Sequence, residues 1–325
     1  MFGRRKESIL IIKIDSLRGF VAAEPLFETL RDRFSEAEIS LLTLPGLRQI
    51  AQVSPYFDRI ATLPDMTNSA DRKAFAKRLA TAKFTKVYDL SNNKHSRKIR
   101  AAFGPFGPKC EVANAPEKRP RNAPPTRSLP SFENLCASLG MDAHTRLPDL
   151  DWALTARRDS ANMSPSWFGI SNAYGLLAPG LVAEQRWPAS HYSELSSLCL
   201  QAGITPVLIG PKEIHSIGDE ICERVPEVVD LIGKTDYLQV IALAHEAGFF
   251  VSDMADEADL CIAVGASGVL IHSENDANAP DLKGDVMRIT AKDAKIDEVD
   301  ARYVWQYLNN MGLISADRAQ NAASR

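Results

Sequence analysis

Residues 176–207 combine residue types, at a spacing, that can bind an anionic ligand. A short apolar run stops at Pro179-Gly180, a polar loop ends in Arg186, and a helix follows with Ser190 as its predicted N-cap. In a parallel α/β sheet, the loop between the carboxyl end of a strand and the start of a helix presents backbone N–H groups to anions. A glycine there allows close approach to the backbone. We therefore predict a ligand-binding loop in this segment.

A group of four carboxylates follows the predicted strand 249–252, at Asp253, Asp256, Glu257 and Asp259. Two interpretations are open. Carboxylate oxygens are the ligands that Mg²⁺ or Ca²⁺ prefers, whereas acidic residues also stabilise the first turn of a helix through the helix dipole. We favour the acidic first turn and expect no metal site.

Composition excludes several classes of protein. The chain has 325 residues, 45% of them hydrophobic, a net charge of −3 and a pI near 6.1. Such a chain forms a large core, more often in two domains than in one, and has no broad basic surface for nucleic acid. We find neither a transmembrane run nor a signal peptide. The five cysteines form no C-x-x-C pair, which fits a reducing cytoplasm.

Apolar runs alternate with helical patterns in both halves of the chain, in units of about 30 residues. This alternation predicts a parallel, doubly wound sheet in each half. The predicted strands are 8–14, 39–42, 58–63, 86–90, 176–178, 207–210, 229–231, 249–252 and 269–271. The predicted helices are 22–34, 47–53, 70–82, 94–103, 132–140, 191–201, 214–224, 237–247, 258–264 and 297–311.

The alternation places one α/β domain at 1–160 and a second at 161–313, followed by a flexible tail at 314–325. Residues 147–154 are interpreted as an edge strand or linker. Residues 104–130 contain seven prolines with interleaved Lys and Arg, a composition that forms neither a helix nor a central strand. This segment is predicted to be an extended loop, either a solvated connector or a contact for an anionic acceptor or lipid headgroup.

Several stretches resemble glycosyltransferase family nine, the ADP-heptose:lipopolysaccharide heptosyltransferases. The quoted matches are PG followed by RWP and VLIGPKE in the second half, and ILIIKIDSLRGFVAAEPLFETLRDRFSEAEISLLTLPG, SPYFDRI and KVYDLSNNKHSRKIRAAFG in the first. The resemblance covers roughly residues 8–271. It implies an α/β fold of the GT-B type, in which two Rossmann-like domains face each other across a cleft.

The resemblance also implies a function. Members transfer a sugar from an ADP-sugar donor to a lipid-linked glycan acceptor during cell-envelope assembly, without a bound cofactor. The chain is then expected in the cytoplasm, with peripheral contact at the inner face of the cytoplasmic membrane. A protein partner is also an open expectation.

In the family, an Asp of the first loop takes the proton of the acceptor hydroxyl. The matching position here is Gly19, which cannot accept a proton. Asp15 and Glu24 are the nearest carboxylates that can replace it, with Ser16 and Arg18 beside them on the acceptor side. The alternative for Asp15 is a loop cap or a partner of Arg18.

The nucleotide side departs from the family in two places. The family's phosphate-binding Lys is replaced by Gln185, which leaves Arg186 and Lys212 as cations and Pro179 and Gly180 for backbone approach. In the turn after strand 249–252, Asp253 and Asp256 stand where a diphosphate would dock, and like charges at ~4–6 Å repel by a few kcal/mol.

Three motifs of one site therefore depart together. Two hypotheses follow: a heptosyltransferase-like enzyme with a relocated base, or a non-catalytic pseudo-glycosyltransferase that acts as a binding or scaffold protein.

Overall fold

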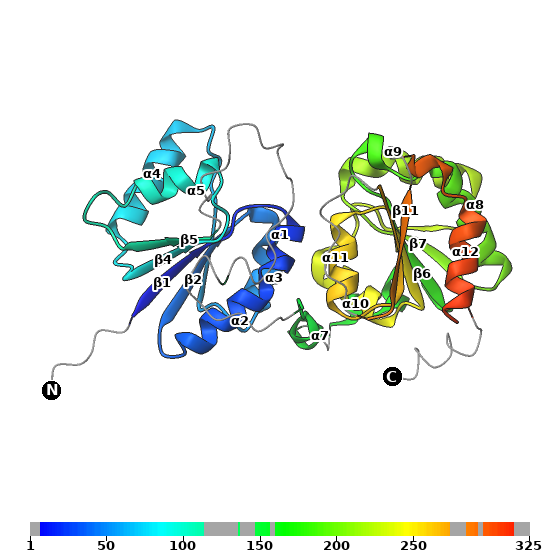
Figure 1. Ribbon diagram of the computed structural model, residues 1–325, viewed down its shortest axis with the longest axis horizontal. Helices are drawn as coiled ribbons and strands as arrows, with labels where there is room; N and C mark the ends of the chain where they lie inside the picture. Colours follow the sequence, from blue (N-terminus) through cyan, green and yellow to red (C-terminus); the bar gives the residue numbers. More distant parts are fainter. Residues whose placement is uncertain are drawn as a thin grey trace. The chain divides into compact units, whose positions relative to one another are not determined.

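A computed structural model describes residues 7–113, 136, 147–156, 160–273, 284–291 and 295–314. The chain divides into two compact units, Met1–Pro148 and Asp149–Arg325, and each contains one parallel sheet (Figure 1). The prediction of an α/β protein with two doubly wound sheets is confirmed. Within the described ranges, no helix is long and apolar enough to cross a membrane.

Unit 1 contains a five-stranded parallel sheet in the order β3-β2-β1-β4-β5. The buried strand β1 is apolar on both faces, as expected for a strand covered by helices on both sides. Helices α4 and α5 pack on one face through Leu79 and Ile99, and α1 to α3 lie on the other (Figure 1). Its elements are β1 (Ser8–Ile12), α1 (Leu17–Ala22), α2 (Glu24–Arg33), β2 (Glu38–Thr43), η1 (Pro45–Leu47), α3 (Arg48–Val53), β3 (Arg59–Thr62), α4 (Ser69–Thr81), β4 (Lys86–Asp89), α5 (Lys94–Ala101) and β5 (Lys109–Val112).

Unit 2 contains a six-stranded parallel sheet in the order β11-β10-β9-β6-β7-β8. Figure 1 shows α8 and α12 on one side of this sheet and α10 and α11 on the other. Its elements are α7 (Asp151–Ala156), η2 (Ala161–Met163), η3 (Pro165–Phe168), β6 (Tyr174–Ala178), η4 (Ala183–Gln185), α8 (Ala189–Gln201), β7 (Thr205–Leu208), η5 (Lys212–Ile214), α9 (His215–Arg224), β8 (Val229–Asp230), α10 (Tyr237–Glu246), β9 (Phe249–Ser252), α11 (Asp256–Ala263), β10 (Gly268–Ser273), β11 (Val286–Ala291), η7 (Ile296–Glu298) and α12 (Ala301–Asn310).

The strand order fixes where each unit can bind a ligand. In both sheets the order reverses direction between the first strand and the fourth, β1 and β4 in unit 1 and β6 and β9 in unit 2. Ligands of doubly wound sheets bind outside the carboxyl ends of the strands at this reversal, the topological switch point. The two switch points are therefore the places to examine for a site.

Three predicted elements differ from the observed ones. Residues 147–154 were expected to be an edge strand or linker, but α7 begins at Asp151, whose N–H is held at 2.9 Å by the Asp149 carboxylate. The predicted helix 22–34 corresponds to α2, which begins at Glu24 with Pro25 in its first turn, and the short helix α1 before it was not predicted. Helix α8 begins at Ala189 after Pro188, so Ser190 is not its N-cap.

Two strands were missed. β5 occupies part of the predicted loop 104–130, where it can form because it pairs with β4 alone at the edge of the sheet. β11 is also an edge strand, and within it only Ile289 and Ala291 are buried. Residues 114–130 of the loop, the predicted helix 132–140 apart from residue 136, and the tail 315–325 lie outside the described residues.

Candidate functional site

The switch point of unit 2 is organised around the buried carboxylate of Asp253. Its Oδ1 accepts hydrogen bonds from the Gly180 N–H at 2.5 Å and the Tyr192 hydroxyl at 2.9 Å, and its Oδ2 accepts one from the Trp187 N–H at 2.5 Å. These donors come from the loop after β6 and from the start of α8. Asp253 therefore joins the ends of β6 and β9 into one rigid unit.

Burial dominates the electrostatics of Asp253. It raises the pKa of the Asp253 carboxyl from 3.8 to about 6, while the hydrogen bonds from Trp187, Tyr192 and Gly180 lower it. Burial and the nearby Asp253 charge raise the pKa of the Tyr192 hydroxyl well above its ordinary value, so that hydroxyl stays a donor. The result is a charged acceptor whose lone pairs are directed at groups of the same unit.

The side chain of Arg186 is hydrogen-bonded to two carbonyls of the predicted ligand-binding loop. Its Nε donates to the Gly180 carbonyl at 2.5 Å and its Nη2 to the Leu181 carbonyl at 2.7 Å. Gln185 is exposed, and so is Lys212, which begins η5 after the end of β7. Of the predicted nucleotide-side residues, Gly180, Arg186 and Asp253 are thus brought together, and Gln185 and Lys212 remain on the surface.

Two further contacts tie this loop to the last elements of unit 2. The indole Nε1 of Trp187 donates to the Val299 carbonyl at 2.7 Å, and a ring nitrogen of His191 lies 2.9 Å from the Asp297 carbonyl. The two rings stack with centroids 5.4 Å apart. Trp187 is fully buried, so it packs against the protein as an anchor for the loop.

The acidic residues after β9 do not converge on one point. Asp256, Glu257 and Asp259 lie in the first turn of α11, where the helix dipole favours negative charge. Glu257 and Asp259 are buried, as is Asp253. Across the described residues, no three His, Cys, Asp or Glu side chains are grouped as a metal ion would require. Between Asp253 and α11, Met254 adopts a positive φ of 73°.

In unit 1, Asp15 follows β1 at the switch point. Its Oδ2 pairs with the Lys13 ammonium at 2.9 Å, and its Oδ1 is buried without a hydrogen-bond partner among the described residues. A Cβ placed on Gly19 would lie 2.9 Å from the Asp15 carboxyl carbon, so a side chain at position 19 would displace this carboxylate. Ser16 is the N-cap of α1 and accepts from the Gly19 N–H at 3.2 Å, and Arg18 follows in the first turn.

Glu24 lies apart from this loop, in the core of unit 1. Its side chain is 2% exposed and accepts a hydrogen bond from the Tyr56 hydroxyl. Tyr56 itself is buried among the aromatic rings of Phe27 and Phe57. Of the two predicted carboxylates, Asp15 is therefore the one at the switch point.

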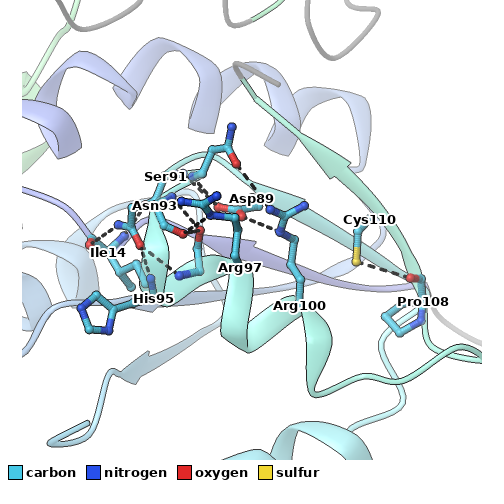
Figure 2. Close-up of polar contacts among 11 residues, drawn as sticks. Ile14, Asp89, Ser91, Asn93, His95, Arg97, Arg100, Pro108 and Cys110 are labelled. Atoms are coloured by element: carbon cyan, nitrogen blue, oxygen red, sulfur yellow. Dashed lines mark hydrogen bonds and ion pairs between the residues drawn. The ribbon is translucent and has the colours of Figure 1, made fainter. Parts of the chain in front are cut away.

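The carboxyl end of β4 contributes a second carboxylate to this switch point (Figure 2). Asp89 is fully buried, pairs with Arg100 Nε at 2.8 Å, and accepts from the N–H groups of Ser91 and Asn92 at 3.1 and 2.9 Å. Asn92 adopts a positive φ of 41°. Asn93 caps α5 by accepting from the His95 and Ser96 N–H groups.

The two turns of unit 1 are bonded to each other. The Ile14 N–H donates to Ser91 Oγ at 2.7 Å, and Asn93 Nδ2 donates to the Ile14 carbonyl at 3.1 Å (Figure 2). The position of Asp15 therefore depends on the turn that Asp89 and Arg100 hold. Sequence reasoning missed this pair, although an Asp at the end of a buried strand followed by Leu-Ser-Asn-Asn was a usable signal.

The fold and these sites define a class, a GT-B-like α/β protein. The E. coli ADP-heptose lipopolysaccharide heptosyltransferase II matches with a TM-score of 0.73 and 17% identity over 94% of this chain and 98% of that one. A family 9 glycosyltransferase from Veillonella parvula matches with a TM-score of 0.73 and 14% identity over 95% and 98%. An E. coli heptosyltransferase solved with ADP matches with a TM-score of 0.72 and 16% identity over 93% of this chain and 99% of that one.

Residues 129–255 match the model of glycosyltransferase family 9 (heptosyltransferase). This range contains the loop after β6, α8 and the turn after β9, and the resemblance seen in the sequence is confirmed. None of the curated protein sequences matched this chain.

Proposed function

We propose that this chain is a heptosyltransferase-like protein of lipopolysaccharide or related cell-envelope glycan assembly, which binds a nucleotide sugar at the switch point of unit 2. The observation that carries the proposal is the parallel order β11-β10-β9-β6-β7-β8 with a Pro179-Gly180 loop at the reversal. Similar structures were solved with ADP and with ADP-2-deoxy-2-fluoro heptose, which supports an ADP-sugar as the donor.

The nucleotide would meet the groups that remain available around Asp253. These are the N–H groups at the start of α8 that precede His191, whose own N–H donates to the Pro188 carbonyl, the exposed Lys212 and Gln185, and the guanidinium of Arg186 on its outer side. Asp256 begins α11 after the neighbouring strand β9, and its negative charge disfavours a second anion nearby. We therefore expect weaker binding of the diphosphate than a loop with a Lys at position 185 would give.

The chemistry of transfer assigns Asp15 as the base. The acceptor hydroxyl attacks the anomeric carbon of the donor, the bond from that carbon to the diphosphate breaks with its electron pair, and the hydroxyl proton passes to a carboxylate. The Asp15 side chain is 28% exposed, so an acceptor hydroxyl can approach this carboxylate. Ser16 and Arg18 lie beside it on the acceptor side.

One observation favours the second hypothesis, a non-catalytic pseudo-glycosyltransferase. The Gly180 and Trp187 N–H groups already donate to Asp253, and Arg186 already donates to two loop carbonyls. Donors that would bind a diphosphate are thus partly used within the chain. In that case the protein acts as a binding or scaffold protein through another surface.

A titration separates the two. Under the first hypothesis, ADP and ADP-heptose raise the melting temperature of unit 2, with about 2.7 kcal/mol of stabilisation at 100 times Kd. Turnover with a lipid-linked glycan acceptor then falls at least about a hundredfold in Asp15→Asn. Asp32→Asn, an exposed carboxylate in unit 1, is the matched control.

The outcomes are distinct. If neither nucleotide changes the melting temperature, the donor site is wrong and the pseudo-glycosyltransferase stands. If ADP-heptose is turned over equally by Asp15→Asn and Asp32→Asn, the donor site holds and the base is another group. The proposal also places the chain at the inner face of the cytoplasmic membrane, where a lipid-linked acceptor is found. Co-sedimentation with acceptor-containing vesicles tests that placement.

A further inference from the structure

Unit 2 contains a pocket that lies away from its switch point. It has a volume of about 490 Å³ and is formed by β11, η7 and α12. Such a volume is typical of small-ligand sites, about 300–1,000 Å³. Its floor is apolar, and the residues that give it chemical character are Arg288, Thr290, Lys295, Glu298, Tyr303 and Tyr307.

Two tyrosines form one wall of this pocket. The Tyr303 and Tyr307 rings pack edge to face with centroids 4.8 Å apart, and their hydroxyls lie 2.9 Å from each other. Tyr303 is 46% exposed, although a large ring on a helix is normally covered by the core it packs on. Paired tyrosines offer an apolar ring surface next to hydroxyls that donate and accept.

The charges around the pocket balance. Arg288 and Lys295 are positive, and Glu298 and Asp300 are negative. Lys295 pairs with Glu298 at 2.6 Å, and Asp300 accepts from the Arg302 N–H at 2.7 Å as the N-cap of α12. A phosphate would be repelled by the two carboxylates as much as it is attracted by the cations. The pocket is therefore suited to an uncharged ligand with many hydroxyls.

We propose that this pocket is a binding site for a neutral saccharide. Sugar hydroxyls both donate and accept, which matches a lining of carboxylates, a guanidinium, an ammonium and phenols. The C–H face of a sugar ring packs against an aromatic surface such as Tyr303 provides. The site uses none of the residues at either switch point, so it goes beyond the proposed donor site and does not depend on it.

The pocket is nevertheless connected to the loop after β6. Val299, which lines the pocket, accepts the hydrogen bond from the Trp187 indole through its carbonyl. A saccharide that packs against Val299 therefore changes the surroundings of a tryptophan at the base of the predicted ligand-binding loop. Indole fluorescence provides a second readout of occupancy.

Calorimetric titration of the full chain with lactose, maltotriose and mannotriose tests the proposal. At least one of these neutral probes is expected to bind in the millimolar range or tighter. Tyr303→Ala weakens that binding at least about tenfold, and Tyr303→Phe, which keeps the ring, stays within about threefold. Asn309→Ala, an exposed change on the same helix, leaves binding unaltered. Circular dichroism verifies that all variants are folded.

Three results overturn the proposal. The first is no binding of any neutral probe at millimolar concentration, and the second is binding of glucose 6-phosphate alone. The third is equal affinity in wild type and Tyr303→Ala. An ADP titration run in parallel separates this test from that of the proposed donor site. If the chain binds a neutral saccharide but not ADP, the donor site is refuted and the saccharide pocket is not.

Discussion

Replacing Arg100 with methionine is expected to destabilise unit 1 and to loosen the turn that positions Asp15. Arg100 is the ion-pair partner of Asp89, whose side chain is fully buried (Figure 2). Methionine retains much of the side-chain volume but has no charge and no N–H group. The change therefore leaves a buried carboxylate without its cation.

The magnitude follows from what Asp89 keeps. Removing one partner of a buried ion pair costs about 3–5 kcal/mol. Asp89 retains hydrogen bonds from the Ser91 and Asn92 N–H groups, and the Arg100 side chain is 22% exposed, so water can reach the vacated side. Both factors reduce the loss, and we expect the free energy of unfolding of unit 1 to fall by about 2–4 kcal/mol.

The assay must report on unit 1 alone. All four tryptophans, at positions 152, 167, 187 and 305, lie in unit 2, so indole fluorescence follows that unit only. Hydrogen exchange of peptides from β1 and β4 during a urea titration gives the stability of unit 1. Arg97→Met is the matched control, because Arg97 is on the same helix and exposed.

The reasoning predicts a specific rescue. Asp89→Asn in the Arg100→Met background removes the unpaired charge and recovers part of the lost stability. If Arg100→Met and Arg97→Met differ by less than about 1 kcal/mol, the Asp89–Arg100 pair does not hold this turn. If Asp89→Asn adds to the loss instead of relieving it, charge burial is not the cause.

Three other changes test the two switch points. Burial raises the pKa of the folded Asp253 carboxyl from 3.8 to about 6. The stability that the protonated carboxyl contributes is therefore full below about pH 4 and is lost as pH rises through 6, which lowers the free energy of unfolding by about 3 kcal/mol. Urea unfolding followed by indole fluorescence should show this slope in wild type and not in Asp253→Ala. Met254→Gly relieves a positive φ and raises the melting temperature of unit 2, equivalent to about 0.5–1 kcal/mol, and an unchanged or lower value would contradict strain at that residue. Gly19→Ala displaces the Asp15 carboxylate and, on the proposed function, lowers turnover at least about tenfold, whereas equal turnover in both proteins would separate Asp15 from catalysis.

The sequence was sufficient to predict the fold because the central strands of both sheets are buried on two faces. Runs such as residues 8–12 are apolar throughout, a pattern typical of parallel sheets covered by helices. The missed strands β5 and β11 are edge strands, which bury few side chains and therefore leave a weak pattern. Helix α7 was missed because its start depends on a side-chain cap by Asp149.

The site was less predictable, for a reason of distance along the chain. The donors to Asp253 lie 61, 66 and 73 residues away, at Tyr192, Trp187 and Gly180. Nothing local to residue 253 indicates that its carboxylate is buried, and it was predicted as part of an acidic first turn of a helix. The pair of Asp89 and Arg100 was missed because a single Asp at a strand end was assigned to the strand.

The bonding around Asp253 also limits how descendants of this sequence can diverge. An ancestor or descendant that loses the Tyr192 hydroxyl leaves the buried carboxylate less well solvated, and one that loses the carboxylate leaves that hydroxyl and two backbone N–H groups short of a partner. The effects of substituting the two side chains on the free energy of unfolding are therefore expected to be non-additive, which makes the two positions epistatic. Lineages that alter one are expected to alter the other within the same interval of divergence.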